Sequence, residues 1–279
     1  MVANLTGTDW LRALRPDPDV RTVLVCFPPG GGSATAYRLL AQRFGSGTAV
    51  FAVQYPGRQD RLGEPLVTDL AELAERTAQD LLGWPDTTRV ALFGHSMGAT
   101  VAYETARRLQ AAGRPPLHLF VSGRTAPASA ATGRLHEGPD EGLIAEVERL
   151  ANDPGPVALL RSEPSLAELV LPALRADYQA VETYRYRAGD PLSCPITALI
   201  STADPTVSVE QAGEWSAYTT ADFQRATFDG GHFYLDLPEN IPAVADLVAR
   251  RLDNQNHPTQ DTTTHTATAN RTSSSASRG

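Results

Sequence analysis

The sequence predicts an α/β fold, in which a mostly parallel sheet is flanked by helices and carries an inserted helical lid. Two patterns predict it. Short apolar runs, many rich in β-branched residues, alternate along the 279-residue chain with segments that have apolar residues at helical spacing. Most of these runs are apolar throughout, as expected for strands that are covered on both faces.

Six apolar runs are the strand candidates, and four other segments are helix candidates. The predicted strands span residues 22–27, 49–54, 89–93, 117–122, 196–201 and 224–228. The predicted helices span residues 36–44, 69–82, 99–112 and 241–252. The second of these helices has a start signal, because Asp69 at the expected N-cap is followed three residues later by the acidic Glu72.

One long stretch interrupts the alternation between the fourth and fifth runs. Apolar residues occur there at helical spacing in 142–151 and again in 165–186, where Pro172 interrupts the pattern. A segment of this length is rarely structureless inside a compact domain. We expect a helical lid at about 127–188, and an ordinary crossover with additional helices is the alternative.

The end of the chain differs in composition from the rest. Residues 253–279 are mostly Thr, Ser, Asn and Ala and contain no Phe, Trp or Tyr. Such a segment offers too little apolar surface to offset the entropy of ordering. We therefore expect one domain at 1–252 and a disordered tail at 253–279.

The overall composition excludes several classes of partner. The formal net charge of −8 argues against nucleic acid and against an anionic membrane, since both require a basic face. The two cysteines, Cys26 and Cys194, lie in or beside apolar runs and are expected to be buried and inert. The sequence has neither a secretory leader pattern nor an apolar run of about 20 residues. We expect a cytoplasmic monomer.

A serine stands between two glycines where a predicted strand gives way to a predicted helix. The motif Gly94-His95-Ser96-Met97-Gly98 has the form G-x-S-x-G in the strand-to-helix context that this motif requires. Glycines permit a tight, strained turn, and the helix N-terminus then faces the space in front of the hydroxyl. Because acyl transfer builds negative charge on an oxygen there, the motif predicts a nucleophile at Ser96. A purely structural turn is the alternative.

A serine nucleophile needs a base within reach, and one of the six histidines suits this role. His232 lies in a glycine-rich loop just beyond the last predicted strand, from which an imidazole can extend over the sheet. His95 lies inside the motif and is expected to point away from the serine. The remaining four lie in a strand, the lid or the tail.

The base in turn needs an acid that orients it, and in this type of fold the order is Ser, acid, His. Asp204 directly follows the strand at 196–201, so it lies at the same sheet edge as Ser96. The alternative is that it only forms a turn with the following proline. Three rival acids are less well placed: Asp190, Asp229 and Asp236.

The oxyanion of an acyl transfer needs two N–H donors. The residue after the nucleophile, Met97, is expected to supply one, and the loop at 28–33 (PPGGGS) the other. Because prolines lack an N–H, the donor is Gly30 or Gly31, and we favour Gly30. A phosphate-binding loop is excluded, since there is no G-x-G-x-x-G and the chain has no lysine. These pieces together indicate an α/β-hydrolase with a Ser-His-Asp triad and no metal or bound cofactor.

Six short motifs are distributed over almost the whole chain before the tail. They read FPPGGGSATAY (27–37), QYPGRQDRLGEP (54–65), FGHSMGA (93–99), LPALRADYQAVETY (171–184), ADP (203–205) and GGHFYL (230–235). In this order they resemble the stand-alone type II thioesterases that accompany modular polyketide and nonribosomal peptide synthases. The PGR-x-DR and LRADY segments separate that family from general lipases and esterases. Pro29 is a departure, because many relatives have a histidine or another residue there.

The resemblance implies hydrolysis of acyl thioesters on the phosphopantetheine arm of an acyl or peptidyl carrier protein, which removes stalled or aberrant groups. The arm belongs to the substrate, so no bound cofactor is implied. The family's triad carries over to Ser96, Asp204 and His232. The alternatives are an acyltransferase or cyclising thioesterase, a general serine esterase, and a carrier-binding protein without activity. Cyclising domains normally end a megasynthase, so a chain that begins and ends on its own is expected to hydrolyse.

Four charged residues in the resembling stretches are not assigned to the predicted site. Arg58 and Arg61 either contact the phosphate of the arm or belong to a turn held by ion pairs. Arg175 and Asp177 are expected to form lid structure.

Overall fold

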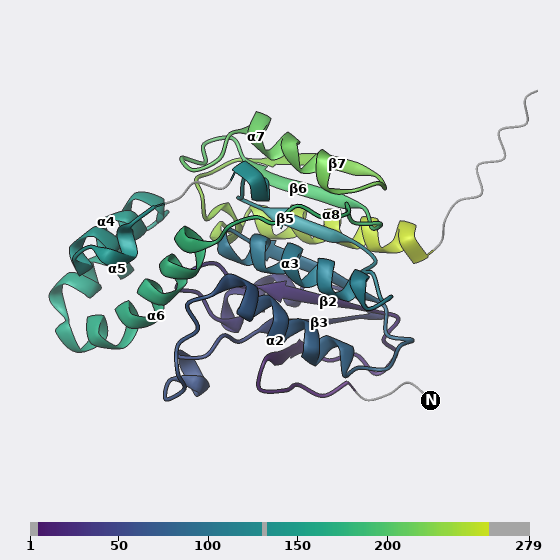
Figure 1. The fold of residues 1–279 in the computed structure, drawn as a ribbon, viewed down its shortest axis with the longest axis horizontal. Helices are drawn as coiled ribbons and strands as arrows, with labels where there is room; N and C mark the ends of the chain where they lie inside the picture. Colours follow the sequence, from purple (N-terminus) through teal and green to yellow (C-terminus); the bar gives the residue numbers. More distant parts are fainter. Residues whose placement is uncertain (1–4, 130–132, 257–279) are drawn as a thin grey trace, which may run out of the picture.

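The computed structural model describes residues 5–129 and 133–256. Within these ranges, seven strands form one sheet in the order β1-β3-β2-β4-β5-β6-β7 (Figure 1). All neighbours are parallel except β1 and β3, which are antiparallel. The strands are Leu11–Arg15 (β1), Thr22–Phe27 (β2), Thr48–Val53 (β3), Val90–His95 (β4), Leu119–Ser122 (β5), Ile196–Ser201 (β6) and Phe223–Phe228 (β7). The predicted mostly parallel sheet is confirmed.

The sequence prediction finds six of these strands and misses β1. This strand lies at the edge of the sheet and pairs with β3 alone. Only Leu11 of its five residues is fully buried, and the segment LRALR contains two arginines. An edge strand of this kind lacks the continuous apolar run that identifies strands covered on both faces.

Helices cover both faces of the sheet and create two apolar layers. One layer lies under α2 (Leu70–Leu82) and α3 (Met97–Ala111), and the other under α1 (Arg38–Ala41) and α8 (Asn240–Asn256). Alternate residues of β2 serve the two layers: Val23, Val25 and Phe27 face the first, and Leu24 and Cys26 face the second. This alternation is why the strand is apolar throughout.

Several predicted boundaries are refined by the structure. Asp69 caps α2 as expected, because its carboxylate accepts the N–H of Glu72 at 3.0 Å. The predicted helix at 36–44 is instead a 3-10 turn, Ala34–Tyr37 (η1), followed by the short α1. Helix α8 continues to Asn256 and so includes the first residues of the predicted tail at 253–279. The rest of that tail lies outside the described residues.

Three further α-helices lie between β5 and β6, in the stretch predicted to form a lid. They are α4 (Asp140–Leu150), α5 (Gly155–Ser162) and α6 (Pro164–Thr183), and Figure 1 shows them beside one end of the sheet. They share a small apolar cluster of their own, which includes Leu143 on α4 and Leu171 on α6. A short helix, α7 (Val209–Gly213), follows β6. None of the described helices is long and apolar enough to cross a membrane.

Helix α6 runs through Pro172 without a break, although the sequence suggested an interruption there. A proline inside a helix removes one backbone hydrogen bond and leaves the carbonyl four residues earlier without its donor. Here Pro172 and the residue with that carbonyl, Glu168, are both exposed, so water can reach the unpaired group. The lid helix therefore tolerates the proline on its solvent face.

A buried histidine precedes β5 and affects how stability depends on pH. His118 Nε2 lies 2.9 Å from Thr197 Oγ1, and the ring stacks on Phe120 at 4.2 Å between centroids. Burial, with a smaller contribution from Arg251, lowers the pKa of His118 to about 3. The folded protein therefore holds this imidazole neutral over a pH range in which the unfolded chain protonates it, below about 6.5.

We expect His118→Gln to reduce the loss of stability in acid. As the pH falls from about 6.5, the unfolded chain binds a proton at His118 that the folded chain does not, so the wild-type free energy of unfolding decreases by up to about 1.4 kcal/mol per pH unit. The variant lacks this contribution. Urea unfolding at pH values between about 6 and 4.5 should therefore give a shallower decrease for the variant. If the free energy of unfolding fell equally with pH in wild type and variant, His118 would be protonated in the folded protein as well.

Candidate active site

The candidate nucleophile lies in a strained turn between β4 and α3. Ser96 has φ 54° and ψ −121°, and Gln59 is the only other described non-glycine residue with a positive φ. A serine in this conformation costs about 1–3 kcal/mol, so the surroundings must hold it in place. The N–H of Ser96 donates to the carbonyl of Ser122 at the end of β5 at 2.8 Å, and its own carbonyl accepts the N–H of Ala99 at 3.0 Å.

The two glycines of the motif are required by close backbone contacts. A Cβ atom on Gly94 would lie 2.2 Å from the carbonyl oxygen of Gly98, and one on Gly98 would lie 2.0 Å from the carbonyl oxygen of Phe27. Strand β4, the start of α3 and the end of β2 therefore meet at a distance that only glycine permits. This is the local reason why the sequence places a serine between two glycines.

The structure brings together the three side chains that the sequence singled out. His232 Nε2 lies 3.0 Å from Ser96 Oγ, and His232 Nδ1 lies 2.9 Å from Asp204 Oδ2. The side chains of His232 and Asp204 are 2% and 0% exposed. Serine, imidazole and carboxylate thus form one hydrogen-bonded chain that is largely shielded from water.

The carboxylate of Asp204 is held in its charged form. Burial by itself would raise the pKa of Asp204, but hydrogen bonds and charge interactions with His232 and hydrogen bonds from Thr206 outweigh it and lower the pKa. Thr206 donates to Asp204 Oδ1 from its backbone N–H at 2.8 Å and from its hydroxyl at 2.7 Å. One carboxylate oxygen therefore faces His232, while the other accepts two bonds from Thr206.

Side-chain hydrogen bonds to backbone carbonyls hold the loop that carries the base. Ser201 at the end of β6 donates its hydroxyl to the carbonyl of Gly230, two residues before His232. The amide of Asn240 at the start of α8 donates to the carbonyls of Asp229 and Tyr234, at 2.8 and 2.9 Å. The histidine loop is thus held on both sides of the imidazole.

The side chains of the rival acids Asp190, Asp229 and Asp236 make no hydrogen bond with His232 within the described ranges.

The sequence prediction for His95 was incomplete. His95 does not contact the serine hydroxyl, but its ring packs against that of His232, with 5.0 Å between centroids. Its Nδ1 lies 2.9 Å from Ser122 Oγ, which in turn lies 2.6 Å from the hydroxyl of Tyr234. Burial, and to a smaller extent the charge of His232, lowers the pKa of His95 well below its usual value. A neutral ring therefore supports the candidate base and adds no positive charge beside it.

The structure distinguishes the hydrogen bonding of the two glycines that the sequence left open as oxyanion donors. The N–H of Gly31 already donates to Asp177 Oδ2 at 2.7 Å, so it is not free. In the described part of the chain, the N–H groups of Gly30 and Met97 have no hydrogen-bond partner. Met97 is the first residue of α3, where an N–H has no partner within the helix. Gly30 and Met97 thus keep free N–H groups, and their role as oxyanion donors stays a prediction.

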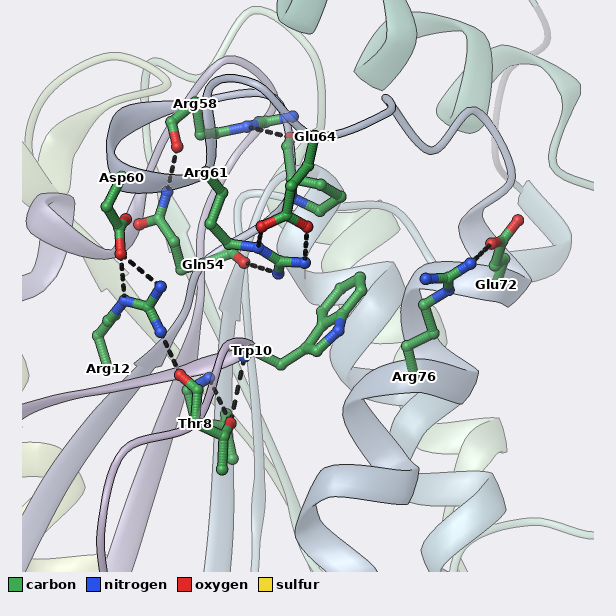
Figure 2. Close-up of polar contacts among 12 residues, drawn as sticks. Thr8, Trp10, Arg12, Gln54, Arg58, Asp60, Arg61, Glu64, Glu72 and Arg76 are labelled. Carbon is green, nitrogen blue, oxygen red and sulfur yellow. Dashed lines mark hydrogen bonds and ion pairs between the residues drawn. The ribbon is translucent and has the colours of Figure 1, made fainter.

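The two arginines of the PGR-x-DR loop are engaged within the protein. Arg58 forms a bidentate ion pair with Asp177 on α6, at 2.6 and 2.9 Å. Figure 2 shows Arg61 held between the carboxylate of Glu64 and the carbonyl of Gln54, at 2.8 and 2.7 Å. Both guanidinium groups are thus engaged in ion pairs, but only the Arg61 pair lies within the turn, because Arg58 pairs with the lid helix. No local feature of the sequence indicates that Arg58 and Asp177 meet.

Two cavities adjoin the glycine loop, and both are lined by Gly30, Gly31 and Phe233. The first, about 180 Å³, lies under the lid and has mainly apolar walls from α4, α5 and α6, among them Val147, Leu160 and Leu174. The second, about 410 Å³, lies on the side of α1 and α8. Within residues 5–129 and 133–256, no group of three or more His, Cys, Asp or Glu side chains is arranged to hold a metal ion.

Comparisons with known proteins agree on one family. Residues 22–252 match the model of the thioesterase domain. The chain is 40% identical over 250 residues to a probable cadicidin biosynthesis thioesterase of Streptomyces griseus. This alignment covers 90% of this chain and 68% of that protein. It is 41% identical over 234 residues to the thioesterase PikA5 of Streptomyces venezuelae. This alignment covers 84% of this chain and 82% of that protein.

Solved structures give the same result. The type II thioesterase BorB from the borrelidin biosynthetic cluster superposes with a TM-score of 0.80 at 42% identity, over 89% of this chain and all of that one. The thioesterase RedJ from the prodiginine pathway of Streptomyces coelicolor superposes with a TM-score of 0.76 at 37% identity, over 83% of this chain and 86% of that one.

Proposed function

Since the chain belongs to the thioesterase family and is a thioester hydrolase, we propose that it removes acyl groups from the phosphopantetheine arms of carrier proteins in a polyketide or nonribosomal peptide synthase. The proposal includes an acyl or peptidyl carrier protein as the partner, a cytoplasmic location and no bound cofactor. The observation that carries it is the hydrogen-bonded chain Ser96–His232–Asp204, together with the unpaired N–H groups of Gly30 and Met97.

The first half of the reaction transfers the acyl group to the enzyme. Ser96 Oγ attacks the thioester carbonyl carbon while His232 Nε2 takes the hydroxyl proton, and Asp204 stabilises the imidazolium that forms. The negative charge moves to the carbonyl oxygen, where the N–H groups of Gly30 and Met97 stabilise it, each by about 2.7–4 kcal/mol. The carbon–sulfur bond then breaks, and the thiol of the arm leaves with the proton from His232.

The second half releases the acid. Water occupies the place of the departed thiol and attacks the acyl-Ser96 ester, and His232 accepts a proton from that water. The same two N–H groups stabilise the second oxyanion. Its collapse breaks the ester bond and returns the proton to Ser96 Oγ, which leaves a free carboxylic acid and the original enzyme.

The cavity under the lid suits the acyl chain. Its walls are apolar side chains from all three lid helices, and it shares Gly30 and Gly31 with the candidate oxyanion loop. An acyl chain in this cavity would bury apolar surface at about 25 cal/mol per Å². Its volume of about 180 Å³ favours a short chain.

The test is the fate of acyl groups on a carrier protein. We expect wild type to convert a propionyl- or butyryl-loaded carrier to the free-thiol carrier and free acid, as followed by intact-mass spectrometry, and Ser96→Ala to leave it loaded. An acyl chain that stays on the carrier while a simple ester is cleaved would indicate a general esterase. An acyl group found on another acceptor, or in a ring, would indicate an acyltransferase or cyclising enzyme.

A further inference from the structure

We propose that Asp177 on the lid helix α6 is a positioning residue for the oxyanion loop, so that docking of the lid fixes the orientation of the Gly30 N–H. The inference rests on the proposed acyl-serine chemistry, because it concerns the donors that stabilise the oxyanion. It deepens that proposal by making the lid part of the catalytic geometry as well as a wall of the acyl cavity.

The carboxylate of Asp177 bridges two loops that follow neighbouring strands. Oδ2 accepts the N–H of Gly31 at 2.7 Å and Nη1 of Arg58 at 2.6 Å, and Oδ1 accepts Nη2 of Arg58 at 2.9 Å. Gly31 follows β2, and Arg58 follows β3. The side chain of Asp177 is 1% exposed and that of Arg58 is 10% exposed, so water competes little for these bonds.

The same contacts fix the backbone around Gly30. Arg58 Nη1 also donates to the carbonyl of Gly32 at 3.2 Å, and the N–H of Gly32 donates to the carbonyl of Pro29 at 2.9 Å. The Pro29–Gly30 peptide, which carries the free Gly30 N–H, is therefore held through its carbonyl by Gly32, and the next peptide is held through the Gly31 N–H by Asp177. Three consecutive glycines have little conformational preference of their own, so the loop depends on these external bonds for its shape.

Packing joins the same helix to the same loop. Leu174 lies on α6 one turn before Asp177, and its Cδ1 lies 2.9 Å from where a Cβ atom on Gly31 would be. Gly31 has φ 74°, which suits glycine and disfavours other residues. A displacement of α6 from the sheet would withdraw both Leu174 and Asp177. The N–H of Gly31 would then lose its acceptor, and the buried guanidinium of Arg58 would lose its counter-charge.

The variant Asp177→Asn tests the proposal with almost no change in volume. Its side chain has one oxygen and one NH₂ group where the carboxylate has two acceptors, so it cannot serve Gly31 and both nitrogens of Arg58 together. With a simple acyl thioester as substrate, we expect kcat to fall by about 10- to 100-fold while KM changes by less than about threefold. The affinity for a boronic acid that forms a tetrahedral adduct on Ser96 should fall by the same factor as kcat, since the adduct places an oxygen in the oxyanion site.

Two further variants separate positioning from general damage to the fold. Arg175→Gln lies on the same helix and breaks bonds within the lid, to Asp140 and to the carbonyls of His136 and Gly138, without touching the glycine loop. We expect it to leave kcat and boronate affinity unchanged. Arg58→Lys keeps the positive charge but loses the bidentate geometry, and it should lower kcat and boronate affinity together by a smaller factor.

The outcomes are distinct. Unchanged boronate affinity in folded Asp177→Asn, or in Arg58→Lys if the first variant does not fold, would overturn the positioning role. A rise in KM at constant kcat would do the same, because it would assign Asp177 to substrate binding. A wild-type protein that hydrolyses no thioester would instead contradict the proposed function.

Discussion

The Ser96→Ala and His232→Ala variants should each lower kcat by roughly 10⁵- to 10⁶-fold, and the double variant should lose no more than either single variant. The reason is the geometry of the pair: Ser96 Oγ is 3.0 Å from His232 Nε2, and the hydroxyl becomes a nucleophile only when the imidazole takes its proton. Once either partner is removed, the other contributes nothing to the attack.

The variants should be compared by single-turnover hydrolysis of an acyl thioester, because the residual rates then do not depend on product release. The loss should appear in kcat with little change in KM, since neither side chain is expected to hold the acyl chain or the arm. Thermal unfolding of each variant provides the control for folding. A double variant that is slower by the product of the two single effects would mean that Ser96 and His232 act independently, which the proposed mechanism does not allow.

The inner part of the fold was predictable because its physical signals are local. Strands covered on both faces must be apolar at every position, and Thr22–Phe27 and Ile196–Ser201 have the same bounds in the structure as in the prediction. The edge strand β1 was not, because its arginines resemble those of a loop until β3 is known to lie beside it. The lid helix α5 was not predicted either, because its segment is short and mostly exposed and carries a weak apolar pattern.

The candidate triad was predictable for a different reason, namely that the carboxyl ends of parallel strands meet at one edge of the sheet. Ser96 follows β4, Asp204 follows β6 and His232 follows β7. Residue type and order were therefore enough to select these three, without any knowledge of distances. The chemistry of the donors also limited the oxyanion loop to Gly30 or Gly31.

The residues that support this site were not predictable from the sequence. Arg58 and Asp177 are 119 positions apart, and either could equally form a local surface pair. His95 and Tyr234 are also far apart in the sequence, yet their rings pack edge to face with 6.0 Å between centroids, and both side chains meet Ser122 at the end of β5. Such contacts depend on side-chain packing between distant elements. Only the structure shows that the Gly31 N–H is occupied and that of Gly30 is free.

The Asp204→Asn variant should lower kcat by about 10⁴-fold although it changes only one atom of the side chain. Thr206 determines how the new amide is oriented, because its N–H and hydroxyl both donate to the position of Oδ1, at 2.8 and 2.7 Å. The amide oxygen must take that position to accept these bonds. The NH₂ group then takes the position of Oδ2, which lies 2.9 Å from His232 Nδ1.

An NH₂ group at this place can only donate, so Nδ1 of His232 must become the acceptor and the proton must move to Nε2. With a proton on Nε2, the imidazole can no longer take one from Ser96 Oγ, and attack on the thioester fails. Nitrogen-15 spectra of His232 should therefore show the Nδ1–H tautomer in wild type and the Nε2–H tautomer in Asp204→Asn. A variant that keeps the wild-type tautomer and loses less than about tenfold in kcat would show that Asp204 does not orient the base.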